Sequence, residues 1–566
     1  MENPYLPLGQ VSFTFGDVFP AGGSSQTFYE SGTWEHPITY FVGRNGSGKS
    51  RTAKLVAESF SGRILSTDRL AGLTLYSNYG YMSVPNNENN RGIPLGAQEK
   101  TQAEDASIKS GIGVAEMYAL RDNPDVLLRV AAFLRRALGR IIDIRENAGF
   151  LDPYIRVGRT EYSLLRDEGH GLRELVILLA AAYREDWTLL VVDEPELHLH
   201  PSMTRLWLSE LEKVCKGTNR RAIVVTHEPS VIKPKSADDL GAIWLFSAGR
   251  ASSSLLTHIP AGQEHRVTSS LVSNPQLVSQ LVFAPRPVLV EGVTDVAALT
   301  TALARTHATE VVAQTDFIEC GGSGFVALWY EISRSAGIDV RAVADLDACL
   351  SSEVQRAMDS NIDVVSSYQT QLGQEPPYTH LVLRPLLDLM NREAVPTSPK
   401  DRSSWLAAEI PTESGYEARF NILLEIWRRS DLWLHRQGTL EDVLGITSKS
   451  REAAQKAAAI PGPIDDVAAW CAFSLDPAGD VRLLLEAALE RIAHTMMEAI
   501  RSTPEQVLVA PVGPTAISDL RLVDVTHLGD SRYRLTVKKP ETFAGFYLDF
   551  SRSTPSDQLT LMPKAE

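Results

Sequence analysis

Short apolar runs alternate with helix-compatible segments over roughly the first 265 residues. Strands are expected at Ile38–Val42, Thr188–Val192 and Arg221–Thr226, because each run is short and rich in branched apolar residues. Each run also ends where a polar, motif-like segment begins. Strands that alternate with helices in this way predict an α/β domain over residues 1–265.

This strand pattern is interrupted between about 86 and 148, where a polar stretch from Asn86 precedes a helical run from Val126 to Arg145. We interpret the segment as a helical insertion in the first domain. A solvated helix face is the favoured interpretation of the arginines in this run, and a DNA-contacting face is the alternative. These arginines are Arg129, Arg135, Arg136 and Arg140.

A second α/β pattern follows a Ser-, Pro- and Gly-containing stretch from Ala251 to Gln263. Its expected strands are Val288–Val290, Phe317–Glu319 and Val340–Ala344. After Leu350 the chain becomes mostly helical, and strand-like alternation returns from Arg521 to Phe550. We therefore expect a second α/β domain over 266–460 and a helical and β extension over 461–566.

Composition narrows the function classes. A chain of 566 residues is too long for one core, and 44% hydrophobic with 22% charged residues is typical of folded protein. The net charge of −15 argues against nonspecific coating of nucleic acid, which needs broad phosphate neutralisation. The four cysteines form no CxxC pair, so a reducing cytoplasm fits. The N-terminal sequence MENPYLPLGQ lacks a signal-peptide pattern, and no apolar run has the length of a membrane span.

Residues 43–50, GRNGSGKS, match the phosphate-binding pattern G-x-x-x-x-G-K-[ST] between an apolar strand and a helix-compatible segment. The glycines let backbone N–H groups converge on phosphate oxygens at a helix N-terminus. Lys49 would reach the β- and γ-phosphates, and Ser50 would ligate Mg²⁺. The expected nucleotide contacts are Gly43, Asn45, Gly46, Gly48, Lys49, Ser50 and Arg51.

Two further motifs follow in the order that ATP hydrolysis requires. The segment TLLVVDEPELHLHP, 188–201, places two adjacent carboxylates at the end of an apolar strand. Asp193 would hold Mg²⁺ through water, and Glu194 would polarise the attacking water. His227 ends the next strand and could sense the γ-phosphate by hydrogen bonding.

The order of these motifs resembles that of ABC-type ATPases, and DEPELHLHP is similar to the Walker B region of their SMC- and RecF-related branch. In that family a Ser-Gly-Gly-Gln-like signature at a helix N-terminus completes the ATP site of a partner subunit. Gly169 and Gly171 of DEGHGLREL fit this signature, whereas Glu168 stands where serine is usual. A helix N-terminus with flexible glycines is the alternative.

The same resemblance bears on a possible metal site after the Walker B strand. Glu196, His198 and His200 alternate along an extended segment and could face one way. Related ATPases carry this LHLHP run as a structural turn beside the nucleotide, and we favour that interpretation.

A second set of carboxylates lies in the later half. Glu291 ends an apolar strand, and Asp295 follows about one helical turn later. Asp345 and Asp347 end another apolar strand, where residues two apart point to one face. Buried acids at a strand end are costly unless a cation compensates them, and oxygen ligands favour Mg²⁺ or Mn²⁺ over zinc. Surface acids at a strand end are the alternative.

This Glu-Gly and Asp-x-Asp arrangement, with Gly321, Gly322 and Gly324 between, resembles the Toprim domain of topoisomerases, primases and certain nucleases. A Toprim domain directly after an ABC ATPase resembles the OLD (overcoming lysogenization defect) nucleases, which include the larger subunit of the Gabija antiphage system. The resemblance covers roughly 38–446.

The resemblance implies roles for individual residues. Glu441, in a Gly-x-Leu-Glu segment, would be an additional acid. Lys449 is the candidate for the transition-state lysine, and Lys456 competes with it. The implied metal-binding residues are Glu291, Asp295, Asp345, Asp347 and Glu441.

The function implied is a cytoplasmic, ATP-controlled, Mg²⁺- or Mn²⁺-dependent endonuclease of bacterial antiphage defence that acts on DNA. We expect a homodimer or higher homo-oligomer through the ATPase halves, an accessory defence protein as a further partner, and no membrane association. Two alternatives stay open. One is a fusion like the PARIS type of ATPase and Toprim nuclease, which cleaves tRNA, and the other is a non-cutting ABC ATPase clamp for repair or recombination.

Overall fold

The computed structural model describes most of the chain between 36 and 472 and three strands near the C-terminus. The described residues are 12–14, 25–27, 36–70, 93–94, 97–147, 150–246, 253–393, 395–410, 416–447, 449–472, 523–529, 532–537 and 547–551. They belong to two compact units, Met1–Cys471 and Ala472–Glu566. The N-terminal segment MENPYLPLGQ, both predicted ends of the insertion at 86 and 148, residues 251–252 and Arg521 lie outside the described residues.

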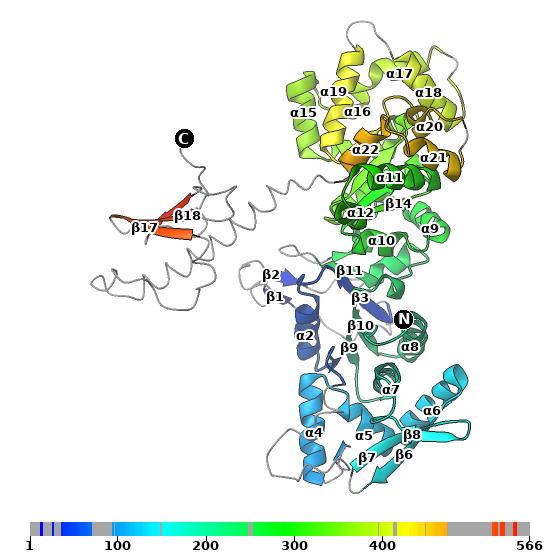
Figure 1. Ribbon diagram of the computed structural model, residues 1–566, viewed down its shortest axis with the longest axis vertical. Helices are drawn as coiled ribbons and strands as arrows, with labels where there is room; N and C mark the ends of the chain where they lie inside the picture. The colour runs from blue at the N-terminus through cyan, green and yellow to red at the C-terminus, as the bar shows by residue number, and fades with distance from the viewer. Residues whose placement is uncertain are drawn as a thin grey trace, which may run out of the picture. The chain divides into compact units, whose positions relative to one another are not determined.

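A six-stranded sheet forms the centre of the first half (Figure 1). Its order is β12-β11-β3-β10-β9-β4, and every neighbouring pair is parallel except β11 with β12. All three strands predicted for this half are present, with ends within about one residue of the prediction. The strands are β3 (Ile38–Gly43), β4 (Arg63–Leu65), β9 (Leu189–Asp193), β10 (Arg221–Val225), β11 (Ile243–Phe246) and β12 (Ser253–Ser254).

Both faces of this sheet are buried, which explains why its strands are continuous apolar runs. Phe41 and Ile223 belong to a cluster with Val56 of α2 (Lys49–Ser59). The neighbouring residues Val42 and Val224 belong to the larger core on the opposite face. That core contains residues of α7 (His170–Tyr183) and α8 (Pro201–Cys215), so the sheet is held between two helical layers.

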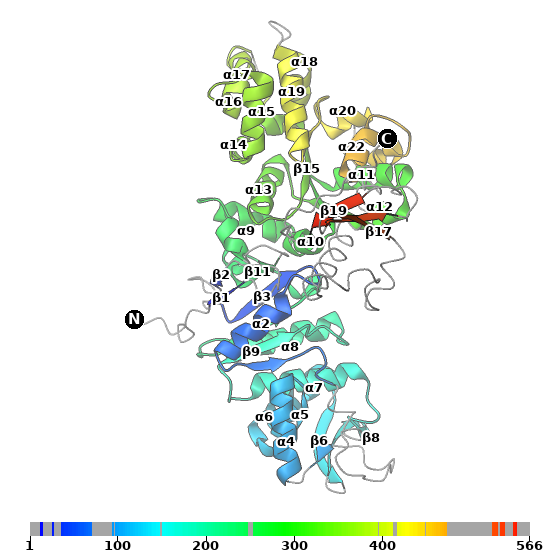
Figure 2. The same cartoon turned by 90° about the vertical axis from the view of Figure 1, so that its left-hand side faces the viewer.

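The predicted insertion contains helices that pack against α7 (Figure 2). The predicted helical run to Arg145 is wrong in its last third, because the last helix of the insertion ends at Leu138 and is followed by Gly139, which adopts a left-handed φ of 65°. The chain then turns into an antiparallel sheet. The elements are α4 (Ala97–Ser110), α5 (Val114–Asp122), α6 (Pro124–Leu138), β5 (Ile93–Pro94), β6 (Ile141–Asn147), β7 (Phe150–Val157) and β8 (Thr160–Ser163).

Three of the four arginines singled out in the predicted run contact their own chain. The Arg129 guanidinium lies 4.3 Å from the centre of the Tyr183 ring. Arg136 forms an ion pair of 3.1 Å with Glu210, and Arg140 pairs with Glu168. These contacts favour a structural face over a DNA-binding face.

A second parallel sheet, of order β14-β13-β15-β16, carries the later half of the same compact unit. Its three predicted strands are present, and β16 is an addition that the short run LWL did not reveal. The strands are β13 (Arg286–Val290), β14 (Thr315–Glu319), β15 (Arg341–Ala344) and β16 (Leu432–Leu434).

Helices flank this sheet and fill the connection between β15 and β16. Helix α22, which lies in the predicted extension from 461, packs with α21 against α11 and so belongs to the unit that holds the second sheet. The helices are α11 (Val293–Thr306), α12 (Thr309–Gln314), α13 (Ser323–Ser335), α14 (Ser352–Asp359), α15 (Ile362–Leu372), α16 (Thr379–Val382), α17 (Arg384–Met390), α18 (Pro399–Glu409), α19 (Tyr416–Arg429), α20 (Leu440–Leu444), α21 (Arg451–Ala458) and α22 (Ile464–Cys471).

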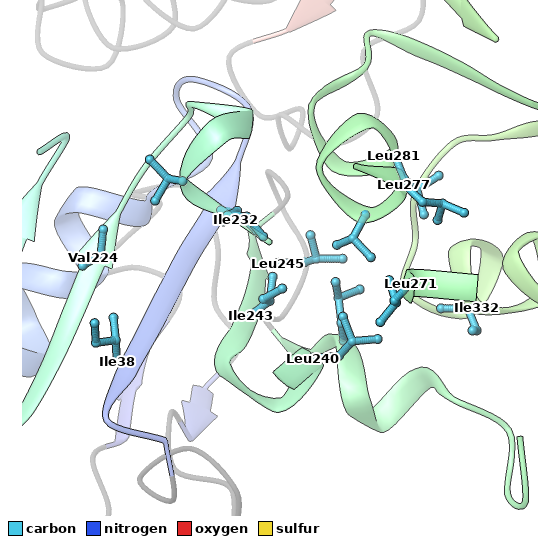
Figure 3. Packing of buried hydrophobic residues seen from close by; sticks show 14 of the residues in the cluster. Ile38, Val224, Ile232, Leu240, Ile243, Leu245, Leu271, Leu277, Leu281 and Ile332 are labelled. Atoms are coloured by element: carbon cyan, nitrogen blue, oxygen red, sulfur yellow. The ribbon is translucent and has the colours of Figure 1, made fainter. Parts of the chain in front are cut away.

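The two sheets are joined through a shared core. Figure 3 shows Ile243 and Leu245 of β11 in the same buried cluster as Leu271 and Leu277, which come from α9 (Glu264–Ser273) and α10 (Leu277–Phe283). The phosphate-loop residue Arg44 also donates a hydrogen bond of 2.6 Å to the carbonyl of Pro285, directly before β13. The two sheets therefore form one packed unit.

Strands occur at both ends of the chain as well. The C-terminal unit contains an antiparallel sheet in the segment where strand-like alternation was predicted. Over the ranges that the structure describes, no helix combines the length and apolarity that a membrane crossing requires. The remaining strands are β1 (Ser12–Thr14), β2 (Ser25–Thr27), β17 (Val523–Gly529), β18 (Arg532–Val537) and β19 (Tyr547–Ser551).

Candidate nucleotide and metal sites

The predicted phosphate loop connects the carboxyl end of β3 to α2. Gly43 has a φ of 144°, and a Cβ there would lie 2.2 Å from the Phe246 carbonyl oxygen, so only glycine permits this strand pairing. The Lys49 ammonium donates to the carbonyl oxygens of Gly43, at 2.8 Å, and Arg44, at 2.9 Å. Burial lowers the pKa of Lys49, and the charges of Glu194 and Asp193 counteract this. The lysine thus lies at the loop, facing the acids of β9.

The other predicted loop residues lie around Lys49. Gly46 and Gly48 have positive φ values of 76° and 90°, which shape the turn before α2. Asn45, Ser50 and Arg51 are exposed at its start.

Asp193 and Glu194 leave the carboxyl end of β9. Burial raises the pKa of Asp193, while a hydrogen bond from Ser50 and the charge of Lys49 lower it. The Asp193 Oδ1 atom is buried without a hydrogen-bond partner in the described part of the chain. A carboxylate oxygen left unpaired beside the Ser50 hydroxyl fits the oxygen-ligand chemistry of Mg²⁺.

His227 follows β10 and contacts the second Walker B carboxylate. Its Nδ1 atom lies 3.0 Å from Oε1 of Glu194. Glu196 shapes the neighbouring turn, since its Oε1 accepts bonds from the Thr226 hydroxyl, at 2.7 Å, and the His227 N–H, at 3.3 Å. The structure therefore brings the phosphate loop, both acids and His227 together at one edge of the first sheet.

The LHLHP histidines have structural contacts. His200 caps α8, because its Nδ1 accepts the Ser202 N–H at 3.3 Å. The His198 ring lies 5.1 Å from the ring of His170, centre to centre. These contacts support the interpretation of the run as a turn.

The predicted signature segment begins α7. Gly171 approaches the Walker B turn closely, since a Cβ there would lie 2.7 Å from the His198 carbonyl oxygen. Glu168, which stands in place of serine, accepts bonds from the Gly169 N–H, at 3.0 Å, and from the Tyr162 hydroxyl, at 2.5 Å. Arg140 also binds its carboxylate. The helix start therefore carries a fixed negative charge that Arg140 offsets.

Glu291 and Asp295 lie where β13 ends and α11 begins. Asp295 is 6% exposed, and its Oδ2 accepts the Gly292 N–H at 3.2 Å. The pKa of Asp295 is raised to about 6, and burial is the main cause. The charge of Glu441 also raises this pKa, whereas hydrogen bonds from the backbone N–H groups of Asp295 and Gly292 lower it. Burial also raises the pKa of Glu291, as do the charges of Asp295 and Asp347.

Asp345 lies next to Glu291 at the end of β15. Its N–H donates to Glu291 Oε1 at 2.8 Å, and its Oδ1 accepts the Leu440 N–H at 3.1 Å. Burial raises the pKa of Asp345, and the charges of Glu291 and Asp295 raise it further. The two carboxyl groups therefore titrate as a pair in which at least one proton is held tightly.

Asp347 reaches the cluster by a different route from the one expected. The strand ends at Ala344, and Asp347 lies in the 3-10 helix Leu346–Leu350, so it does not share a strand face with Asp345. Its Oδ1 accepts the Ser403 hydroxyl at 2.8 Å, and its N–H donates to the same hydroxyl at 3.1 Å. Helix α18 thus fixes this aspartate.

The last two predicted residues complete the acidic cluster. Glu441 is 3% exposed, and its Oε1 lies 3.9 Å from the ammonium of Lys449. The charge of Lys449 lowers the pKa of Glu291, Asp295, Asp345 and Asp347. Lys456 instead pairs with Glu452 at 2.7 Å. The structure thus places Lys449, not Lys456, among the acids.

The acids lie near one another but do not form a complete coordination shell for a metal ion. Throughout the described ranges, no three Asp, Glu, His or Cys side chains are close enough to hold a metal ion as they stand. Carboxyl groups whose pKa values are raised by each other's charge still form a site that a divalent cation would stabilise. The all-oxygen donor set fits Mg²⁺ or Mn²⁺.

Sequence reasoning missed several residues near both sites. Ser403, which binds Asp347, and Arg402, whose charge lowers the pKa of Asp347, lie in a helical region without a motif. Arg69, which binds the carbonyls of Asp193 and Glu194, lies in a turn that likewise carries no pattern. Only the tertiary structure brings these residues to the sites.

Comparison with known proteins finds a known domain in each half. Residues 128–233 match the family described as "AAA domain, putative AbiEii toxin, Type IV TA system". Residues 282–347 match the family described as "Overcoming lysogenization defect protein-like, TOPRIM domain". The fold is thus that of a P-loop ATPase joined to a Toprim domain. This pair of domains is the one found in OLD-family ATPase–Toprim proteins, the family that the sequence motifs resemble.

Individual relatives and solved structures match parts of the chain. Protein ea59 of Escherichia phage lambda is 33% identical over 78 residues, which span 13% of this chain and 15% of ea59. The SMC head domain from Thermotoga maritima is 15% identical, with a TM-score of 0.25 over 44% of this chain and 99% of that one. Stu0660 of Streptococcus thermophilus is 12% identical, with a TM-score of 0.24 over 48% of this chain and 91% of that one.

Proposed function

We propose that this protein is an ATP-hydrolysing, divalent-metal-dependent endonuclease of the OLD type that acts on DNA in bacterial antiphage defence. The two matched domains support ATPase and nuclease activity in general terms. The observation that carries the nuclease assignment is the cluster of Glu291, Asp295, Asp345 and Asp347, in which the charges of neighbouring acids raise the pKa of Glu291 and of Asp345.

In the ATPase half, each residue has a task that its position supports. Lys49 would exchange its bonds to two loop carbonyls for bonds to phosphate oxygens. Asp193 and Ser50 would hold Mg²⁺ with ATP. Glu194, which contacts His227, would orient and polarise the attacking water, and His227 would contact the γ-phosphate. Hydrolysis of the β–γ phosphoanhydride gives ADP and phosphate.

In the Toprim half, Glu291, Asp295, Asp345 and Asp347 would bind the cation, with Glu441 as a further acid. A bound Mg²⁺ or Mn²⁺ would supply Lewis-acid stabilisation of the phosphate and a more acidic water. The Lys449 ammonium, close to Glu441, would offset negative charge that develops on the phosphodiester. Asp347 is held in place by Ser403.

Net charge explains why such a site would need the cation. The chain carries −15, and its acidic cluster would repel a phosphodiester in the absence of metal. A divalent ion reverses the local charge, so an acidic protein can approach nucleic acid at this place.

The test is a cleavage assay in which plasmid DNA and total tRNA are incubated separately with Mg²⁺ or Mn²⁺, with and without ATP. We expect DNA cleavage by the wild type and loss of cleavage, with ATP hydrolysis retained, in Asp345→Asn. Asp316→Asn, which changes an exposed acid of the same sheet, is the matched control. Cleavage of tRNA alone would overturn the DNA assignment. Absence of all cleavage would favour the non-cutting ATPase.

A further inference from the structure

Arg69 is a fully buried arginine that contacts the Walker B residues through their backbone. It follows β4 and is 0% exposed. One terminal nitrogen, Nη1, donates to the carbonyls of Ser66, at 2.8 Å, and Asp193, at 2.7 Å. The other, Nη2, donates to the carbonyl of Glu194 at 2.8 Å. The guanidinium thus holds two successive peptide groups of the hydrolytic segment.

The Nε atom of the same guanidinium forms an ion pair with Glu174. Glu174 is 1% exposed and lies on α7, the helix that begins at the signature segment. Burial raises the pKa of Glu174 to about 7, and the charge of Arg69 counteracts this. Each member therefore depends on the other, because removal of one leaves a charge buried without a partner.

The backbone that Arg69 holds is conformationally unusual. Glu194 has a φ of 48°, a left-handed value that is strained for a residue with a side chain. Its N–H donates to the Val225 carbonyl at 2.8 Å, and its carbonyl accepts from Arg69. These two bonds set the direction of the carboxylate that contacts His227.

We propose that Arg69 is a positioning residue for ATP hydrolysis, which fixes the backbone of Asp193 and Glu194 and links it through Glu174 to the signature helix α7. Displacement of α7 would then shift the Glu194 carboxylate, so hydrolysis depends on where the signature helix lies. The proposal rests on the ATPase part of the proposed function and goes beyond it, since neither residue is one of the predicted nucleotide contacts.

A second buried ion pair provides a matched control. Arg63 binds Glu116 through two bonds of 2.9 and 2.7 Å, and the two side chains are 7% and 0% exposed. This pair joins β4 to α5, and none of its bonds reaches Asp193 or Glu194. Its loss should lower stability in the same way without moving the Walker B backbone.

The experiment measures ATP turnover and binding of a fluorescent ATP analogue by the full chain. We expect Glu174→Gln and Arg69→Lys to lower kcat on the order of 10- to 100-fold, with nearly unchanged analogue affinity. Glu116→Gln should keep kcat near the wild-type value. Equal losses of kcat in Glu174→Gln and Glu116→Gln, or wild-type kcat in Glu174→Gln, would overturn the link.

The double variant Arg69→Met/Glu174→Met separates positioning from stability. An apolar pair of similar volume often replaces a buried ion pair without loss of stability. We expect a folded variant whose Tm lies closer to the wild-type value than that of Arg69→Met alone, since no buried charge is left without a partner. Its kcat should stay low, because the bonds from Arg69 to the carbonyls of Asp193 and Glu194 are absent. Wild-type kcat in this folded variant would overturn the proposal but leave the ATPase assignment intact. A wild-type chain without any ATP turnover would overturn the ATPase assignment and the proposal together.

Discussion

The acidic cluster should destabilise the metal-free protein, and Asp295→Asn should relieve part of that cost. Asparagine keeps an acceptor for the Gly292 N–H, which Asp295 binds at 3.2 Å, but carries no charge. The variant should therefore be more stable than the wild type in EDTA, although it should no longer cleave nucleic acid.

The magnitude follows from the pKa of Asp295. Burial raises this pKa from 3.8 to about 6. A difference of about 2 units corresponds to about 3 kcal/mol, since one unit is ~1.4 kcal/mol. Because the folded state binds the proton more tightly, unfolding free energy falls as pH rises from about 4 to 6 and stays low above that range. An asparagine at this position would not titrate, so Asp295→Asn should not show this fall in unfolding free energy. Its unfolding free energy should equal that of the wild type near pH 4 and exceed it by at most about 3 kcal/mol above pH 6.

The assay is thermal unfolding in EDTA at a series of pH values. The second sheet belongs to the compact unit Met1–Cys471. At ~1 °C per kcal/mol for a unit of that size, its Tm should rise by at most ~3 °C at pH 7 and hardly at all at pH 4. Glu310→Gln, an exposed change on α12, is the control and should have little effect. A lower Tm for Asp295→Asn at pH 7, or a difference that does not depend on pH, would refute the reasoning.

Three other predictions concern activity. Lys449→Ala should reduce cleavage by at least an order of magnitude, whereas Lys456→Ala, which removes a surface pair with Glu452, should cleave normally; the reverse order would exclude Lys449. Lys49→Ala should abolish ATP turnover, measured by phosphate release, and undiminished turnover would rule out the phosphate-loop role. EDTA should stop cleavage and Mn²⁺ should restore it in the wild type, and cleavage that persists in EDTA would contradict the metal requirement.

Both sheets could be predicted from the sequence because their strands are buried on both faces. In the sequence such strands are short apolar runs, and the motif residues follow directly after them. The predicted helix to Arg145 was wrong because apolar residues at 141, 142 and 144 also fit a strand, and the left-handed Gly139 decides between the two. The three-residue β16 was too short to show any periodicity.

Site residues could be predicted from the sequence where they end a strand or directly follow one. Asp193, Glu194 and Asp345 follow β9 and β15 directly or end them, so parallel topology alone brings each to an edge of its sheet. Ser403 and Arg69 reach the same edges from separate segments, and their distances to Asp347 and the Walker B carbonyls are set by tertiary packing. A single serine or arginine outside a motif gives no sequence signal of that packing.

The central claim is that the carboxylates at the end of β13 and β15 bind a divalent cation. Titration of Mn²⁺ into the nucleotide-free protein, followed by electron paramagnetic resonance, tests this claim most directly. The account predicts that Lys49→Ala, which disables the phosphate loop, still binds Mn²⁺ and that Asp345→Asn and Glu291→Gln bind it much more weakly. Mn²⁺ binding that is unchanged in both cluster variants, or absent from the wild type, would contradict it.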